Sequence, residues 1–219
     1  MSSSSETHTF TIDQQSLHAF FVSLQGGLIP SFVRDEAHEA FKQLAPYLKD
    51  SSQALYIRDI PFLAIDGKYA GGHCYNRSEA MISVPDWATD RSQLVAAINH
   101  ELHHMARWQN PGYGNTLGGA LVSEGIASYY EGLRSGWQSP WSEALITKNH
   151  AELALKEWDS ETYDHGEWFF DGKLGKWVGY ALGTRLAKEL YKDGFDLSNS
   201  IHITPAEAKS SLEAVIQHL

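Results

Sequence analysis

The feature of this 219-residue chain that most constrains its fold is a change in sequence pattern near residue 90. Residues 54–87 contain short runs of aromatic and β-branched residues interrupted by turn formers, which is typical of short strands joined by turns. Beyond Asp90 the apolar residues recur with helical spacing, and helix-start signals occur at Asp90, at Ser139 before Pro140, and at Thr204. A small early sheet followed by four or five helices predicts an α+β fold rather than alternating strands and helices.

The first fifty residues are predicted to be helical behind a short leader. Residues 1–9 are rich in serine and threonine, and we expect them to be disordered. Apolar residues then recur at roughly helical spacing over residues 12–24, and a second helix is expected over about residues 32–48. We therefore expect a single domain over residues 10–219, divided into N-terminal helices (10–50), the only sheet (54–87) and a helical part (90–219).

The composition excludes several classes of protein. The 27 acidic residues outnumber the 17 lysines and arginines, and the basic residues are scattered, which disfavours binding to nucleic acid or to an anionic membrane. The single cysteine, Cys74, allows neither an intramolecular disulfide nor a four-cysteine zinc site. The N-terminus lacks the features of a secretory signal, and no apolar run is long enough to span a membrane, so we expect a cytoplasmic protein.

Residues 100–104 read His-Glu-Leu-His-His and contain the pattern His-Glu-x-x-His as His100, Glu101 and His104. On a helix, residues four apart differ by about 40° around the axis and about 6 Å along it, so both imidazoles can bind one metal ion. Glu101 lies about 100° from His100, beside the ion, where its carboxylate can take a proton from a metal-activated water. His103 is turned away from the metal face by a similar angle and is expected to be structural. The pattern predicts a catalytic metal site.

A catalytic zinc site needs a third protein ligand, for which Glu124 is the best candidate. No third histidine follows His104 at the spacing His-x-x-Gly-x-x-His, which excludes that class of protease. Glu124 lies on the next predicted helix, beyond a linker rich in turn formers, and its apolar and small neighbours indicate a buried carboxylate that must be paired or coordinated. Glu131, two helical turns later on nearly the same face, is a rival ligand or a partner of a zinc-bound histidine.

These motifs resemble those of a bacterial family of predicted zinc-dependent proteases, a domain of unknown function. The resemblance rests on residues 100–104, on Ser-Glu-Gly-Ile-Ala at 123–127 and on Trp-Val-Gly-Tyr-Ala-Leu-Gly at 177–183, and it covers roughly residues 71–219. It implies a gluzincin, a thermolysin-like zincin with an active-site helix and an edge strand that lines the cleft. Carried over residue by residue, it implies that one Zn²⁺ is bound by His100, His104 and Glu124, with Glu101 as general base and acid.

The expected reaction is hydrolysis of a peptide bond in a peptide or protein substrate. Tyr180 is the first candidate to stabilise the oxyanion, because it lies on a helix whose glycines leave one face bare, and His165 is the second. The bare glycine face, at residues 175, 179 and 183, predicts either a close helix crossing or room for a substrate. Residues 71–84 are the natural candidate for an edge strand that pairs with the substrate backbone.

Two other functions remain open at this point. The chain could be a catalytically inactive zincin-like module that binds peptides or regulates a partner, or its zinc could be purely structural, although Glu101 argues against the latter. His73 and Cys74 are interpreted as a strand residue and a small buried thiol rather than as metal ligands. The sequence leaves the oligomeric state open.

Overall fold

A computed structural model describes residues 3–219 of the chain. Its contacts divide the chain into two units, which are Met1–Gln109 with Leu133–Trp137, and Asn110–Gly132 with Gln138–Leu219. The expectation of a single domain over residues 10–219 stays a prediction.

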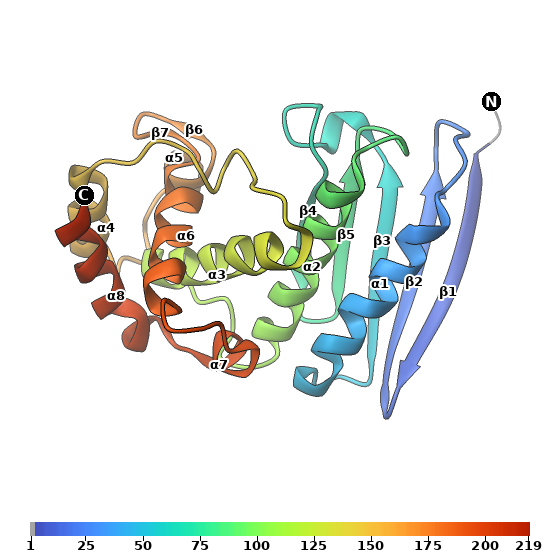
Figure 1. The fold of residues 1–219 in the computed structure, drawn as a ribbon, viewed down its shortest axis with the longest axis horizontal. Coiled ribbons are helices and arrows are strands. Elements are labelled where there is room, and N and C mark those ends of the chain that lie inside the picture. Colours follow the sequence, from blue (N-terminus) through green and yellow to red (C-terminus); the bar gives the residue numbers. More distant parts are fainter. Residues whose placement is uncertain (1–2) are drawn as a thin grey trace. The chain divides into compact units, whose positions relative to one another are not determined.

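The first unit is built on a five-stranded sheet with the strand order β1-β2-β3-β5-β4 (Figure 1). The edge pairs β1·β2 and β4·β5 are antiparallel, whereas β2·β3 and β3·β5 are parallel. The parallel pair β2·β3 needs a crossover connection, which contains helix α1. The strands are β1 (Ser4–Ile12), β2 (Gln15–Ser23), β3 (Ser52–Asp59), β4 (Gly71–Asn76) and β5 (Glu79–Val84).

The N-terminal strands correct the sequence-based prediction. Of the predicted leader, residues 1–2 lie outside the described residues, whereas residues 4–9 belong to β1; the predicted helix over residues 12–24 is largely strand β2. The side chains of Leu17, Ala19 and Phe21 are fully buried, so the buried positions recur every second residue, as in a half-buried strand. The predicted helical spacing depended on Phe20 and Leu24 being buried, but Phe20 is only half-buried and Leu24 is exposed. The sheet is therefore not confined to residues 54–87.

Two helices accompany this sheet, α1 (Ser31–Leu44) and α2 (Arg91–Trp108). Helix α1 contacts α2, β1 and β2, and α2 contacts β4 and β5 (Figure 1). The prediction of a helix over residues 32–48 is confirmed, except that its last turn is the short 3₁₀ helix η1 (Ala45–Tyr47). A second 3₁₀ helix, η2 (Pro61–Leu63), lies between β3 and β4. The Asp90 side chain accepts a hydrogen bond from the backbone N–H of Ser92 and caps α2 as predicted.

The second unit is helical around one apolar core. Its helices are α3 (Leu117–Ser135), α4 (Lys148–Lys156), α5 (His165–Phe169), α6 (Val178–Leu190), α7 (Leu197–His202) and α8 (Pro205–His218). A two-stranded ribbon of β6 (Asp171–Gly172) and β7 (Gly175–Lys176) separates α5 from α6. Thr204 and Glu207 form a capping box at the start of α8, as the sequence predicted. No helix begins at Ser139, because Ser139 and Pro140 lie in a turn segment and the next helix starts after its cap, Thr147.

The glycines of α6 serve a close helix crossing. A Cβ atom on Gly125 of α3 would lie 2.1 Å from the carbonyl carbon of Gly183, so the two backbones touch at these residues. Gly179 makes room for the Phe169 ring, whereas Gly175 lies in β7, before the helix begins. The observed order of an early sheet followed by mostly helical chain is the predicted α+β fold. In the described part of the chain, no helix combines the length and the apolarity that crossing a membrane requires.

Candidate metal centre

Helix α2 carries two histidines one turn apart. His100 and His104 are 8% and 5% exposed, and their Nε2 atoms lie 3.0 Å apart. The helix is held in place by buried apolar residues on the same element, which are Leu94, Ile98, Leu102 and Met105. The local geometry expected of His-x-x-x-His on a helix is thus present, with two ring nitrogens directed at one point.

Glu101 lies between α2 and the edge strand β4. Its side chain is 4% exposed, and a Cβ atom built on Gly72 would lie 2.5 Å from its Cγ and 2.7 Å from its Oε1. Any side chain at position 72 would therefore overlap the Glu101 carboxylate. Gly72 is the residue that lets the backbone of β4 pass this close to Glu101.

Glu124 lies on α3 and is 8% exposed. The phenol of Tyr113 donates a hydrogen bond to Glu124 Oε1 at 2.5 Å, and the Ser123 hydroxyl donates to the Tyr113 carbonyl oxygen at 3.1 Å. Burial, followed by the charge of Glu124, raises the pKa of Tyr113 well above its usual value, so the phenol remains a donor at neutral pH. The carboxylate is thereby fixed through one oxygen.

The sequence-based reasoning missed Tyr113, which it read only as part of a linker. The sequence feature that could have identified Tyr113 is the pair of glycines on either side of it. Gly112 and Gly114 have φ values of +89° and +87°, a conformation that other residues rarely adopt. A Cβ atom on Gly119 would lie 3.1 Å from the Tyr113 carbonyl oxygen, so the loop also lies close against the start of α3. A tyrosine between two left-handed glycines directly before a helix marks a loop with one defined shape.

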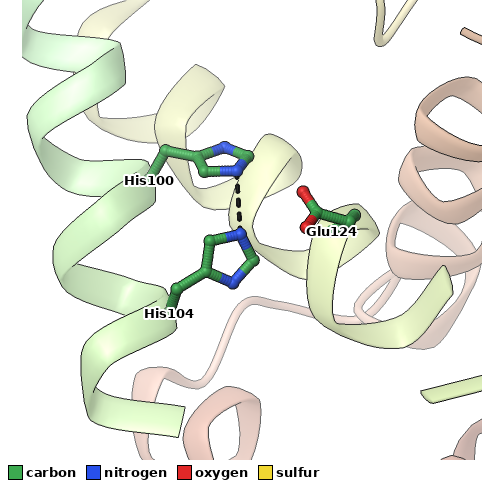
Figure 2. A group of neighbouring side chains, drawn as sticks. All are labelled: His100, His104 and Glu124. Atoms are coloured by element: carbon green, nitrogen blue, oxygen red, sulfur yellow. Dashed lines mark hydrogen bonds between the residues drawn. The ribbon is translucent and has the colours of Figure 1, made fainter. Parts of the chain in front are cut away.

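One ligand atom from each of His100, His104 and Glu124 lies within 4.8 Å of the other two, and all three residues are buried. Figure 2 shows both imidazoles and the Glu124 carboxylate directed toward one another. The three residues predicted to bind a metal therefore form one group. His103 is not part of this group: it is fully buried, and desolvation together with the charge of Arg107 lowers its pKa well below the usual value.

Glu131, the rival candidate, lies outside the group of ligand atoms, and its role as a partner of a zinc-bound histidine stays a prediction. It is 1% exposed and accepts a hydrogen bond from Trp141 Nε1 at 3.2 Å. It is absent from the group of possible ligands among the described residues. Cys74 is buried and donates to the Asn76 carbonyl oxygen, and the His73 ring meets the Tyr75 ring edge-on, which agrees with their interpretation as strand residues.

The two predicted oxyanion donors lie in the same unit as Glu124. Tyr180 is half-buried on α6, its ring contacts the Phe169 ring edge-on, and it contributes to the raised pKa of Tyr113. His165 stacks on Phe169 with ring centroids 4.6 Å apart, and its Nδ1 lies 3.3 Å from the Tyr163 hydroxyl oxygen.

Tyr163 is a second residue that the sequence-based reasoning missed, and it interacts with both His165 and Glu124. Burial and then the charge of Glu124 raise the pKa of Tyr163. The charge of Glu124 thus acts on the pKa of both Tyr113 and Tyr163, and Tyr163 and Tyr180 also raise the pKa of Tyr113.

Comparison with known proteins gives one family and several distant structures. The family described as Predicted Zn-dependent protease (DUF2268) matches residues 59–210. An M1 zinc metallopeptidase from Deinococcus radiodurans is 11% identical with a TM-score of 0.49, and the alignment covers 98% of this chain and 51% of that one. An aminopeptidase N family protein from Idiomarina loihiensis is 8% identical with a TM-score of 0.44, covering 96% of this chain and 41% of that one.

This chain thus spans about half the length of the Deinococcus structure that it resembles. No curated protein matches the chain significantly. The family match extends over well more than half of the residues and includes the whole of α2 and α3. The chain therefore belongs to the family of predicted Zn-dependent proteases, as its motifs indicated.

Proposed function

We propose that this protein is a zinc-dependent peptidase of the gluzincin type, in which His100, His104 and Glu124 hold one Zn²⁺ and Glu101 transfers the protons. The observation that carries the proposal is the grouping of three buried ligand atoms within 4.8 Å, with Glu101 next to one of the histidines in sequence. The family to which the chain belongs supports the same metal and the same class of reaction.

The chemistry of the donor set fits zinc. Two imidazole nitrogens and a carboxylate oxygen are ordinary Zn²⁺ ligands, and three protein ligands are the number found in catalytic sites. In a tetrahedral site with bonds of about 2.0–2.1 Å, neighbouring ligand atoms lie about 3.3 Å apart, which is close to the 3.0 Å between the two Nε2 atoms. A buried carboxylate facing two imidazoles is also compensated best by a cation.

When bound, zinc supplies a Lewis acid that polarises the scissile carbonyl and lowers the pKa of the attacking water. The protein's own contribution to the reaction is the carboxylate of Glu101, which takes a proton from that water and returns it to the nitrogen of the leaving amine. Gly72 leaves room for the Glu101 carboxylate beside β4. A substrate that lies along β4 therefore has its scissile peptide bond next to this base.

Strand β4 is the substrate-binding strand in this proposal. Among residues 3–219 it is an edge strand paired only with β5, so its other side offers N–H and C=O groups to an extended peptide. This defines the substrate class as peptides that can adopt an extended conformation. Tyr180 and His165 are the proposed donors to the oxyanion, by their position in the unit that carries Glu124.

The test is the variant Glu101→Gln, which keeps the size of the side chain and removes its basicity. Hydrolysis of a quenched fluorescent peptide library should fall about 10²- to 10⁴-fold while the zinc content stays at the wild-type value. Full activity of this variant would remove Glu101 from the mechanism. A wild-type protein that binds zinc and peptides but cleaves no member of the library would refute the peptidase.

A further inference from the structure

Strand β4 presents its two faces to different surroundings. Gly72 faces helix α2, because a Cβ atom built on it would meet the Glu101 side chain. Side chains alternate between the two faces of a strand, so Gly71 and His73 face the opposite side of the sheet. The position of Gly71 agrees, since a Cβ atom there would lie 2.6 Å from Ile65 Cγ1. This opposite side is called the His73 face below.

Two aromatic side chains of β4 lie exposed on the His73 face. His73 is exposed, Tyr75 is 47% exposed, and their rings meet edge-on with centroids 4.9 Å apart. The Tyr75 hydroxyl donates to Met81 Sδ at 3.6 Å, and Met81 is also the residue of β5 opposite His73. Both rings therefore lie on the same face as Met81, beside the edge at which β4 has no partner strand among residues 3–219.

The His73 face carries a row of apolar side chains that runs across the sheet. His73 lies opposite Met81 of β5, which lies opposite Tyr56 of β3, which in turn lies opposite Phe20 of β2. The Phe20 and Tyr56 rings stack with centroids 4.8 Å apart. A strand that joins β4 adds one more position to this row. Aromatic and β-branched side chains form the favourable cross-strand pairs with an aromatic residue, so they suit the added position.

The occupant of this position follows from the proposed function, on which this inference rests. A substrate that joins β4 has its scissile bond next to Glu101, whose side chain lies against Gly72. The two residues that flank a peptide bond in an extended chain point to opposite faces. One of them therefore points toward α2, and the other lies on the His73 face.

We propose that His73 and Tyr75 form the subsite for this second residue, and that the subsite selects an aromatic or β-branched side chain. The substrate class is thereby narrowed to extended peptides with such a residue next to the scissile bond. Ile65, which lies against Gly71 on the same face, adds an apolar neighbour to the subsite.

The experiment measures peptide binding to the zinc-loaded Glu101→Gln variant, so that the result does not depend on cleavage. The probes are two fluorescently labelled short peptides, one of alternating tyrosine and serine and the other of alternating alanine and serine. Their dissociation constants are determined by fluorescence anisotropy with and without His73→Ala. The matched control is His18→Ala, because His18 of β2 lies two residues from Phe20 and thus on the same face of the sheet. His73→Phe keeps an aromatic ring in the subsite.

The tyrosine peptide should bind more tightly than the alanine peptide, and His73→Ala should lower this ratio about 1.5- to 5-fold, the range of an aromatic cross-strand pair. His18→Ala and His73→Phe should keep the ratio. Equal binding of the two peptides, an unchanged ratio in His73→Ala, or the same loss in His18→Ala would overturn the subsite. Failure of the peptidase is a separate result, because it is measured by cleavage of the peptide library and not by these dissociation constants.

Discussion

Gly72 lies directly against Glu101, and this close approach makes a sharp prediction for Gly72→Ala. The added Cβ would lie 2.5 Å from Glu101 Cγ, 2.7 Å from its Oε1 and 2.8 Å from its Cδ. Carbon atoms in contact lie about 3.5–4.0 Å apart, so the carboxylate must move by about 1 Å. The group that moves is the end of a flexible side chain, and Gly72 has no positive φ value, so the fold itself should tolerate alanine.

A displacement of about 1 Å at a catalytic group can cost up to about 10²-fold in rate. We therefore expect kcat for a peptide substrate to fall about 10- to 100-fold, which corresponds to about 1.4–2.7 kcal/mol of transition-state stabilisation. The melting temperature should change little. In the background of Glu101→Gln, Gly72→Ala should cause no further fall in kcat, because the side chain that it displaces no longer acts as a base.

The matched control is Gly71→Ala in the same strand. Its Cβ would lie 2.6 Å from Ile65 Cγ1, so the overlap is of similar size but falls on an apolar side chain away from the base. Gly71→Ala should lower the free energy of unfolding. Its kcat should fall far less than the kcat of Gly72→Ala. Wild-type kcat for Gly72→Ala, or an equal loss in both variants, would refute the proposed relation between Gly72 and Glu101.

Three further predictions follow from the contacts around Glu124, from the helix crossing and from a surface carboxylate. Tyr113→Phe should weaken zinc binding about 10- to 100-fold in a chelator competition because Glu124 loses a hydrogen bond, and Tyr163→Phe should not, since no hydrogen bond from Tyr163 to Glu124 is observed. Gly125→Ala should lower the free energy of unfolding by about 3 kcal/mol or more in urea titrations, or prevent folding, because its Cβ would lie 2.1 Å from a rigid backbone; wild-type stability would contradict the close crossing. Hydrogen bonds, first from the Ser78 hydroxyl, lower the pKa of Asp50 in the folded state, so the stabilisation is present above the unfolded pKa and is lost as pH falls through the folded one. Asp50→Asn should therefore reduce stability at pH 7, and its difference from wild type should shrink as the pH falls below the unfolded pKa of about 3.9; a difference that stays constant as the pH falls would count against this linkage.

Helix α2 and the convergence of its two histidines could be predicted from the sequence because both depend on local signals. The spacing of His100 and His104 on one helix face depends only on helical geometry, and the Asp90 cap that starts this helix is a local signal as well. Glu124 was found because small and apolar neighbours revealed its burial, which the structure gives as 8% exposure. These parts need no knowledge of distant contacts.

The N-terminal strands could not be predicted in the same way. Residues 17–24 contain both a helical and an alternating apolar pattern, and the choice between them is made by pairing with β3, more than thirty residues along the chain. Tyr113 was missed for a related reason, because a loop residue acquires its role only when the following helix brings Glu124 to its phenol. Local sequence patterns predict which secondary-structure elements a segment can form, whereas long-range packing decides between a helix and a strand where both patterns are present.

The central claim is that two imidazoles of α2 and the carboxylate of Glu124 hold one zinc ion, and zinc affinity measured by chelator competition tests it most directly. Wild type should bind one Zn²⁺ per chain, Glu124→Ala should bind it more than about 100-fold more weakly, and Glu131→Gln should stay within about tenfold of wild type. Unchanged affinity in Glu124→Ala, or loss of zinc in Glu131→Gln alone, would contradict the ligand set.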